Sequence, residues 1–437
     1  MTSTDDLTTA ATGDGSPTGR PWGVSSGSVV DPDGSGADAS GFHGDPGTGS
    51  STPGPSGESW VISSGGHEAT VVEVGGGLRS YTVDGVDLVD GYPADELPKG
   101  CRGQVLAPFA NRIRDGLYSF EGVQHQLDIG EVATHTAFHG LVRWQSWQVE
   151  VLEPDSVTLT TTVQARDGYP FTVRLGVRYS VGPGGLTVEH TATNRGSTSA
   201  PFMMATHCYP TVSGTVVDEL RLTVPAATFV PTDDRLLPLP SEPVDGTPYD
   251  FRHGPVFGDR VVDNAYGDLS RDPDGRVRVT VTAPDGHGFQ VWAGDTFPWL
   301  QVYSSDTMTQ ERFRRSFAIE PMTAPPDAFR SEIDLVVLRP GRRWEGRWGI
   351  TPVSAGEHPS TGEFDRDAQG PARGTGPAIG GGETVSSPPV TGTAADLLPD
   401  SPTEETATRR ADVAPADPAS REDDERILRE VPPHHLG

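Results

Sequence analysis

The chain has 437 residues and a formal net charge of -28, because 61 acidic residues outnumber 33 basic ones, of which only Lys99 is a lysine. So acidic a chain is a poor ligand for nucleic acid or an anionic membrane surface, and we expect neither as a partner. Two cysteines, Cys101 and Cys208, are too few for a disulfide framework. Residues 1–20 lack the basic and apolar regions of a secretory signal, and no apolar run approaches the ~20 residues of a membrane span, so we expect a cytoplasmic protein.

The two ends of the chain differ in composition from its middle. Both ends are rich in Gly, Pro, Thr and acidic residues and poor in large apolar side chains. Such segments cannot bury enough surface to offset the entropy of ordering. We therefore predict a disordered tail over residues 1–57, a folded domain over 58–354, and a disordered acidic tail rich in Pro, Ala and Thr over 355–437.

The middle of the chain carries the pattern of β-strands. Apolar and polar residues alternate over 157–163 and 171–181, as in a strand with one buried face. Gly182-Pro183-Gly184-Gly185 predicts a hairpin turn before a further strand over 186–192. Similar segments follow at 277–281, 289–291, 300–302 and 333–337. Because no long stretch has helical spacing, we predict an all-β fold, a large antiparallel β-sandwich.

The first polar cluster within this region is Asn111-Arg112, which follows the apolar residues Phe109 and Ala110. An Arg beside an Asn at a strand end supplies a fork of donors for the hydroxyl groups of a ligand. The alternative is an ordinary ion pair between Arg112 and one of the many acidic residues.

The second cluster contains His135 and His139, with Glu131 four residues earlier. On a helix this spacing would suit metal ligands. However, the β-branched residues among them and Gly140 after them disfavour a helix. We therefore predict that His139 points into a cleft from a loop, and we predict no metal site.

The third cluster ends an apolar run at His207-Cys208-Tyr209. An imidazole there can accept or donate a proton near neutral pH, although a structural core histidine is the alternative. Neighbours on a strand point to opposite faces, so a Cys208–His207 nucleophile pair is not expected. Asp263, in the fourth cluster, could accept hydrogen bonds from hydroxyl groups or cap a turn.

A single carboxylate, Glu320, follows the apolar residues Phe317-Ala318-Ile319 and precedes Pro321. Proline biases the residue before it towards extended backbone, so we expect Glu320 at the end of a strand, held among apolar neighbours. Burial raises the pKa of a carboxyl group and makes it a usable general base. The alternative is a surface glutamate at a turn.

Taken together, these clusters resemble the aldose 1-epimerase (mutarotase) family over about residues 59–353. The shared motifs, in chain order, are Asn111-Arg112-Ile113 followed by Gly116-x-Tyr118-x-Phe120-x-Gly122, His139-Gly140-Leu141, Tyr169-Pro170-Phe171, His207-Cys208-Tyr209, Asp263-Asn264-Ala265-Tyr266 and Ile319-Glu320-Pro321-Met322-Thr323. Cys208 stands where the family usually has Pro or Ser, and we expect its side chain to face away from the site.

The resemblance implies a mutarotase-like supersandwich and an enzyme that interconverts the α and β anomers of free aldohexoses such as glucose and galactose. It implies that Glu320 is the base at the anomeric hydroxyl and His207 the acid at the ring oxygen, without a metal or an organic cofactor. It implies a small-molecule sugar as the partner of a monomer or dimer. The substrate-binding residues would be Arg112, His139, Asp263, Asn111 and Tyr209.

Other functions remain open from the sequence. A hexose-6-phosphate 1-epimerase would need cations for the phosphate, which Arg102, Arg314 or Arg315 could supply. A non-catalytic carbohydrate-binding protein would bind sugars without changing their rate of mutarotation. A glycosidase normally needs two carboxylates that flank the scissile bond, so one Glu with one His favours epimerisation over hydrolysis.

Overall fold

The computed structural model describes residues 54–355. The two predicted tails lie outside this part of the chain, except for residues 54–57 and 355. Within 54–57, the side chain of Ser56 is buried and lies 3.3 Å from the hydroxyl of Tyr92. The predicted domain boundaries stay predictions.

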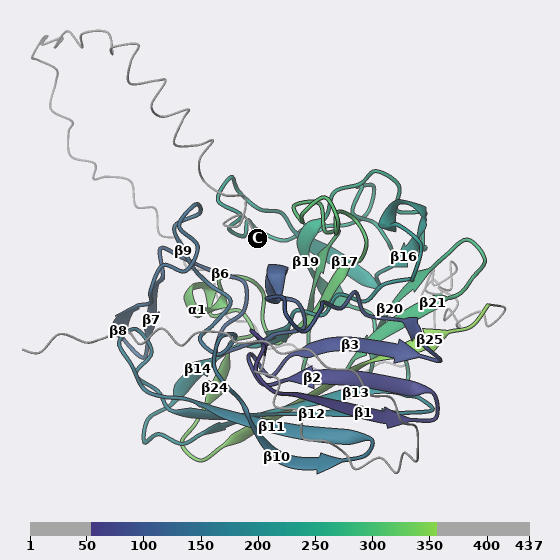
Figure 1. The fold of residues 1–437 in the computed structure, drawn as a ribbon. Coiled ribbons are helices and arrows are strands. Elements are labelled where there is room, and N and C mark those ends of the chain that lie inside the picture. Colours follow the sequence, from purple (N-terminus) through teal and green to yellow (C-terminus); the bar gives the residue numbers. More distant parts are fainter. Residues whose placement is uncertain (1–53, 356–437) are drawn as a thin grey trace, which may run out of the picture. The chain divides into compact units, whose positions relative to one another are not determined.

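The largest sheet has eight strands in the order β10-β11-β12-β13-β25-β21-β20-β16 (Figure 1). Its strands are β10 (Gln148–Glu153), β11 (Ser156–Val163), β12 (Val173–Gly182), β13 (Gly185–Asn194), β25 (Arg343–Val353), β21 (Gly288–Ala293), β20 (Val277–Thr282) and β16 (Arg221–Thr223). Gly182 pairs with Gly185 where β12 turns into β13, so the hairpin predicted from the Gly-Pro-Gly-Gly sequence is confirmed.

A second sheet has seven strands in the order β18-β17-β19-β22-β23-β15-β5. Its strands are β18 (Glu242–Pro243), β17 (Ala226–Val230), β19 (Asp263–Leu269), β22 (Trp299–Tyr303), β23 (Ala318–Met322), β15 (Ala205–Thr206) and β5 (Val105–Leu106). This sheet carries three of the predicted polar clusters, because β15, β19 and β23 contain or directly precede them.

Smaller elements surround the two large sheets. Four strands form one further sheet, β1 (Ser59–Ser64), β2 (His67–Val72), β3 (Leu78–Val83) and β4 (Val86–Asp87). Three pairs are β6 (Arg112–Arg114) with β9 (Thr136–Phe138), β7 (Leu117–Phe120) with β8 (Val123–Gln126), and β14 (Ala200–Phe202) with β24 (Val336–Leu338). The helices among the described residues are short: η1 (Lys99–Cys101), η2 (Val217–Glu219) and α1 (Ala328–Ser331).

The strand predicted over 333–337 is wrong in its first half. Only Val336–Leu338 form a strand, and the preceding residues turn out of α1. Glu332 and Asp334 have positive φ angles of 59° and 49°, a backbone conformation that interrupts a strand.

The named strands of residues 54–355 pair in antiparallel fashion, which confirms the predicted all-β antiparallel architecture. Buried apolar residues of the eight-stranded and seven-stranded sheets belong to one core. A polar contact crosses this core, where the hydroxyl of Thr206 in β15 lies 3.0 Å from Nε2 of His190 in β13. The sheet of β1–β4 lies against β11–β13 of the largest sheet (Figure 1).

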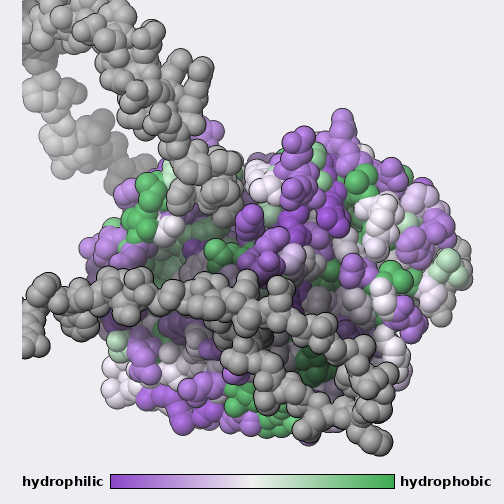
Figure 2. Space-filling view, viewed as in Figure 1, coloured by the Kyte–Doolittle hydropathy of each residue, from purple (hydrophilic) through white to green (hydrophobic). Residues whose placement is uncertain are grey.

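Polar residues cover most of the face of the described residues that Figure 2 shows. On the face in Figure 2, hydrophilic residues predominate and hydrophobic residues form small separate patches, in keeping with the acidic composition. Among these residues, no helix has the length and apolar character that a membrane span requires.

Candidate active site

Glu320 lies in the middle of β23, not at the end of a strand as its sequence predicted. The strand continues through Pro321, although proline has no N–H to donate. On this edge the neighbouring N–H groups of Ile319 and Thr323 donate to the carbonyls of Cys208 and Met204. Pairing with β15 there is limited to Ala205 and Met322, so the missing N–H of Pro321 costs the sheet little. The predicted burial is confirmed, since Glu320 is 3 % exposed.

The site is built on adjacent strands, because β23 lies beside β15 and His207 directly follows β15. Nε2 of His207 lies 3.4 Å from Oε1 of Glu320, and the two side chains are 9 % and 4 % exposed. The structure thus brings together the two residues that the sequence predicts to be catalytic. They are in direct contact instead of facing each other across a cavity.

Burial sets the proton balance of this pair. Desolvation raises the pKa of Glu320 well above its usual range; the nearby charge of Asp263 adds to the rise and that of Arg112 opposes it. Desolvation, with a further contribution from the charge of Arg102, lowers the pKa of His207 to about 3. These opposite shifts favour the proton on Glu320 over His207 in the absence of a ligand.

A second histidine, His139, stands beside the pair. It follows β9 with a positive φ of 54°, and its ring centroid is 5.3 Å from that of His207. The backbone N–H of Asn111 donates to Nδ1 of His139 over 3.1 Å, so the ring proton of the neutral form is on Nε2. Burial lowers the pKa of His139 well below 6.5, and the neutral form is therefore the one present.

The other histidine of that cluster lies elsewhere. His135 sits in a turn before β9, its side chain is 65 % exposed, and its Nδ1 lies 3.2 Å from Oδ1 of Asp115. The strand β9 between His135 and His139 rules out the helical pair of ligands that their spacing suggests. The described residues contain no group of His, Cys, Asp and Glu side chains that could hold a metal ion.

Arg112 does form an ion pair, with Glu131. Its Nε and Nη2 donate to the two carboxylate oxygens over 2.6 and 2.9 Å. This bidentate pair fixes the guanidinium, whose Cζ lies 5.1 Å from the ring centroid of Phe138. In the sequence, Glu131 stands out only by its spacing from the two histidines, as a metal ligand would, and nothing there marks its ion pair with Arg112.

A narrow hollow lies near the pair, although neither Glu320 nor His207 is among the residues that line it. The residues that line it lie at the start of β6, at the end of β17 and in the loop after it, in β19 and β22, and just before α1. They are Asn111, Arg112, Val230, Thr232, Leu236, Asp263, Ala265, Gln301 and Pro326. Gln301 links this hollow to the Glu320–His207 pair, because it is the cross-strand partner of Glu320.

Gln301 also holds Asp263. Its Nε2 donates to Oδ1 of Asp263 over 2.7 Å, while its own buried Oε1 has no hydrogen-bond partner in the described residues. Desolvation raises the pKa of Asp263, although Arg112 and Gln301 oppose the rise. A hydroxyl group of a ligand could therefore find both a donor and acceptors here. The sequence analysis did not single out Gln301, and only its pairing with Glu320 reveals it.

Tyr209 and Cys208 do not face this hollow. The ring of Tyr209 stacks on His207, and its hydroxyl donates to the carbonyl of Gly100 over 2.9 Å. Cys208 is fully buried, and desolvation raises the pKa of its thiol, which favours the neutral thiol.

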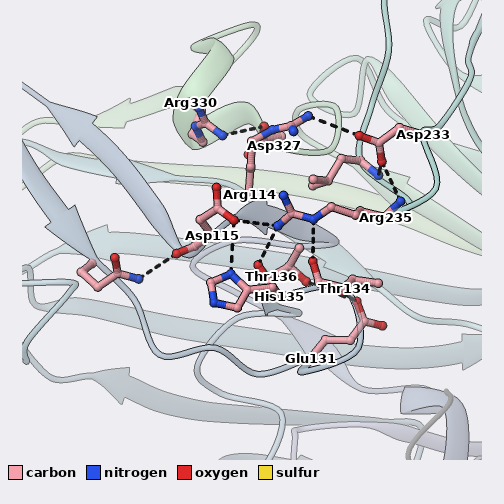
Figure 3. Close-up of polar contacts among 12 residues, drawn as sticks. Arg114, Asp115, Glu131, Thr134, His135, Thr136, Asp233, Arg235, Asp327 and Arg330 are labelled. Carbon is pink, nitrogen blue, oxygen red and sulfur yellow. Dashed lines mark hydrogen bonds and ion pairs between the residues drawn. The ribbon is translucent and has the colours of Figure 1, made fainter. Parts of the chain in front are cut away.

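The loop that supplies Thr232 and Leu236 to the hollow is tied to the turns around β6 and β9 (Figure 3). Arg235 donates to the carbonyls of Thr134 and His135 over 3.0 Å each and to Oδ1 of Asp115 over 2.7 Å. We call this set of contacts the Arg235 clamp. The sequence analysis missed it, since nothing in the sequence marks Arg235 as different from other arginines.

Two arginines considered for a phosphate are already paired. Arg102 lies 2.6 Å from Asp90 and is 2 % exposed. Arg314 pairs with Asp218 over 2.7 Å and with Asp306. Neither guanidinium is available to a phosphate without breaking a buried ion pair.

Comparison with known proteins relates most of the described residues to one family. The family model described as Aldose 1-epimerase matches residues 58–351. The Escherichia coli (strain K12) protein named uncharacterized protein YihR is 34% identical over 288 residues, which cover 66% of this chain and 91% of that protein. The galactose mutarotase of Homo sapiens is 25% identical over 267 residues, 56% of this chain and 76% of that protein.

Solved structures show the same fold. The GalM/aldose epimerase homologue from C. elegans superposes with a TM-score of 0.61 at 23% identity, over 68% of this chain and 99% of that one. The galactose 1-epimerase from Lactobacillus acidophilus NCFM gives a TM-score of 0.56 at 17% identity, over 66% and 92% of the two chains.

Proposed function

Since the chain belongs to the aldose 1-epimerase family, we propose that it interconverts the α and β anomers of a free aldohexose such as glucose or galactose. The observation that carries the proposal is the 3.4 Å contact between Nε2 of His207 and Oε1 of Glu320, beside a hollow lined by Arg112 and Asp263. This arrangement supplies a base, an acid and groups that hold hydroxyls in one place.

The proposed reaction opens and closes the sugar ring by proton transfer. Glu320, as the carboxylate, takes the proton of the anomeric hydroxyl while His207, as the imidazolium, gives a proton to the ring oxygen. The bond between C1 and the ring oxygen then breaks to give the open-chain aldehyde. Rotation about the C1–C2 bond and the reverse proton transfers close the ring with C1 inverted.

The close contact of the pair suits this chemistry. The anomeric oxygen and the ring oxygen are bonded to the same carbon, so two neighbouring groups can address both oxygens of one substrate. Moving the shared proton from Glu320 to His207 leaves the net charge of the site unchanged, and a bound sugar can hydrogen-bond to both groups as it does so. General acid–base catalysis of this kind contributes about 10²–10⁴-fold.

The remaining predicted residues have proposed roles in holding the substrate. Arg112, fixed by Glu131, donates to hydroxyl groups, and Asp263 accepts from them. Asn111 sets the tautomer of His139, which leaves Nε2–H of that ring as a donor. Holding the sugar in one orientation is what converts proton transfer into an efficient reaction.

We also propose that the protein works in the cytoplasm. Cys101 and Cys208 are both free and buried, as is usual in a reducing compartment.

Polarimetry with freshly dissolved sugars tests the proposed activity. We expect the purified protein to accelerate the approach of α-D-glucose or α-D-galactose to the equilibrium rotation, with glucose 6-phosphate a poorer substrate because Arg102 and Arg314 are engaged. A faster rate with glucose 6-phosphate would favour a sugar-phosphate epimerase. Binding of sugars without any acceleration would leave a carbohydrate-binding protein and reject the enzyme.

A further inference from the structure

The imidazole of His207 lacks the contact that usually orients such a ring. A histidine that moves protons is normally held by a hydrogen bond at its second nitrogen. In the described part of the chain, Nδ1 of His207 is buried and has no hydrogen-bond partner from another residue. The contact between Nε2 and Glu320 alone cannot fix the plane of the ring, so ring packing has to do so.

Tyr209 supplies this packing. Its ring is nearly parallel to that of His207, with the centroids 4.9 Å apart and the planes at 8°. The ring of Tyr209 is itself held at its tip, because the hydroxyl donates to the carbonyl of Gly100. At its base, the carbonyl of Tyr209 accepts from the backbone N–H of Asp90 over 2.8 Å.

Arg102 lies over the same tyrosine ring. Its Cζ is 4.4 Å from the ring centroid. Its Nη2 donates to Oδ2 of Asp90 over 2.6 Å, its Nε to the carbonyl of Asp90 over 3.0 Å, and its Nη1 to the carbonyl of Lys99 over 3.2 Å. Asp90 in turn lies 3.2 Å from Nη1 of Arg312. These hydrogen bonds hold the buried guanidinium of Arg102 in a fixed position against the ring of Tyr209.

The residues that follow Arg102 hold the backbone of His207. The N–H of Gly103 donates to the carbonyl of His207 over 2.8 Å, and the N–H of His207 donates to the carbonyl of Gln104 over 3.1 Å. Gly103 has a φ of 68°, and a Cβ there would lie 1.9 Å from the carbonyl oxygen of Leu78. Only glycine fits, so this segment is fixed on both sides of His207.

We infer that Arg102 is a positioning residue for His207: held by Asp90, it fixes the Tyr209 ring against which the imidazole stacks. The inference rests on the proposed function, because it concerns the group that acts as the acid there. It also gives Tyr209 the role of a support in place of the sugar contact expected from the sequence.

Arg102 also acts on His207 through its charge. The titratable or charged groups around the imidazole are Glu320 from β23, His139 after β9, Tyr209 and Cys208 after β15, and Arg102 and Arg143 from the segments after β4 and β9. The two arginines both disfavour the imidazolium, and Arg102 has the larger effect. Removing its charge therefore raises the pKa of His207.

The main test compares two substitutions at Arg102 in the full chain by polarimetry over a range of pH. We expect Arg102→Gln to lower kcat about 10²-fold through misplacement of the imidazole, with KM within about 3-fold. The limb of the pH–rate profile that His207 sets should move up, by at most about one unit. Arg102→Lys keeps the charge but not the planar contact, so kcat should fall while the limbs stay in place.

Arg314→Gln is the matched control. Arg314 is also a buried arginine with two carboxylate partners, and it touches neither member of the catalytic pair. It should lose stability in urea unfolding but keep kcat and the pH profile. The inference is overturned when Arg102→Gln loses no more kcat than Arg314→Gln and leaves the limb set by His207 unmoved.

If Arg102→Gln does not fold, Tyr209→Leu tests whether Tyr209 supports the imidazole of His207. It leaves Arg102 and Asp90 in place and removes only the ring between Arg102 and His207. A loss of kcat with KM retained supports the support role. A rise in KM with kcat retained means that Tyr209 contacts the sugar, and the inference fails.

A measurement without substrate separates this inference from the proposed function. The ¹⁵N resonances of His207, assigned with His207→Gln, report the charge of the ring as the pH is lowered. We expect protonation to begin at a higher pH in Arg102→Gln than in the wild type. Identical titrations reject the inference even where mutarotation is observed, and a shift supports it even where no tested sugar is turned over.

Discussion

At the scale of single residues, the site depends on burying two ionisable groups against each other. Glu320 and His207 are each costly to bury as isolated charges, but together they need only one proton. Their side chains are nearly inaccessible without a ligand, so their pKa values are set by desolvation and by Asp263, Arg112 and Arg102. A carboxyl group in such a place is more basic than one in water.

Glu320→Gln tests the proposed base directly. Glutamine keeps the size of the side chain but cannot accept the proton, so we expect the mutarotation rate to fall by about 10²–10⁴-fold. Sugar affinity, measured by calorimetry, should change little. Glu345→Gln is the matched control, since Glu345 is 61 % exposed and pairs only with Arg343. Equal rates for wild type and Glu320→Gln would remove Glu320 from the reaction.

At the scale of elements, one wall of the hollow is a loop whose position depends on contacts with other segments of the chain. The 231–238 loop follows β17, and Asp233 shapes it by accepting from the N–H groups of Arg235 and Leu237 over 2.9 Å each. The Arg235 clamp then joins the loop to the turns around β6 and β9 (Figure 3). The wall formed by Thr232 and Leu236 therefore depends on contacts between segments far apart in the chain.

Arg235→Ala should release this wall. We expect KM for the sugar to rise several-fold while kcat stays close to the wild-type value, because the catalytic pair lies on other strands. The loss of unfolding free energy should stay below about 1 kcal/mol, since the ion pair with Asp115 is partly exposed. The control is Arg166→Ala, which removes a more exposed ion pair with Asp128. A KM equal to that of the control would mean that the clamp does not shape the site.

At the scale of the whole molecule, the two large sheets meet at a neutral histidine. Nε2 of His190 accepts from Nε1–H of Trp348 over 3.1 Å and lies 3.0 Å from the hydroxyl of Thr206. A proton on Nε2 would face the Trp348 donor, and burial lowers the pKa of His190 to about 3. In the unfolded chain the same group titrates near 6.5, so below that pH the unfolded state binds the extra proton.

The stability of the fold should therefore depend on His190 as the pH falls. Its contribution is fully present above pH 6.5 and is lost as the pH drops from 6.5 towards 3. Relative to His190→Gln, the wild type should lose about 2 kcal/mol of unfolding free energy between pH 7 and pH 5. Urea unfolding at the two pH values measures this. A difference between the two proteins that does not change with pH would contradict it.

The sequence determined the class of fold and the types of residue at the site. Alternation over 171–181 and 186–192 predicted β12 and β13, because side-chain direction in a strand follows directly from position. The apolar neighbours of Glu320 predicted its burial. These features are local, and they can be read without knowing which strands become neighbours.

Only the tertiary structure decided which of these residues meet. Sheet order places β23 beside β15 and β22, and that order sets the contacts of Glu320 with His207 and Gln301. It also decided that Glu320 lies inside a strand and that Tyr209 faces His207 and Gly100 in place of the hollow. These outcomes depend on pairing and register between distant segments, and no local pattern in the chain encodes them.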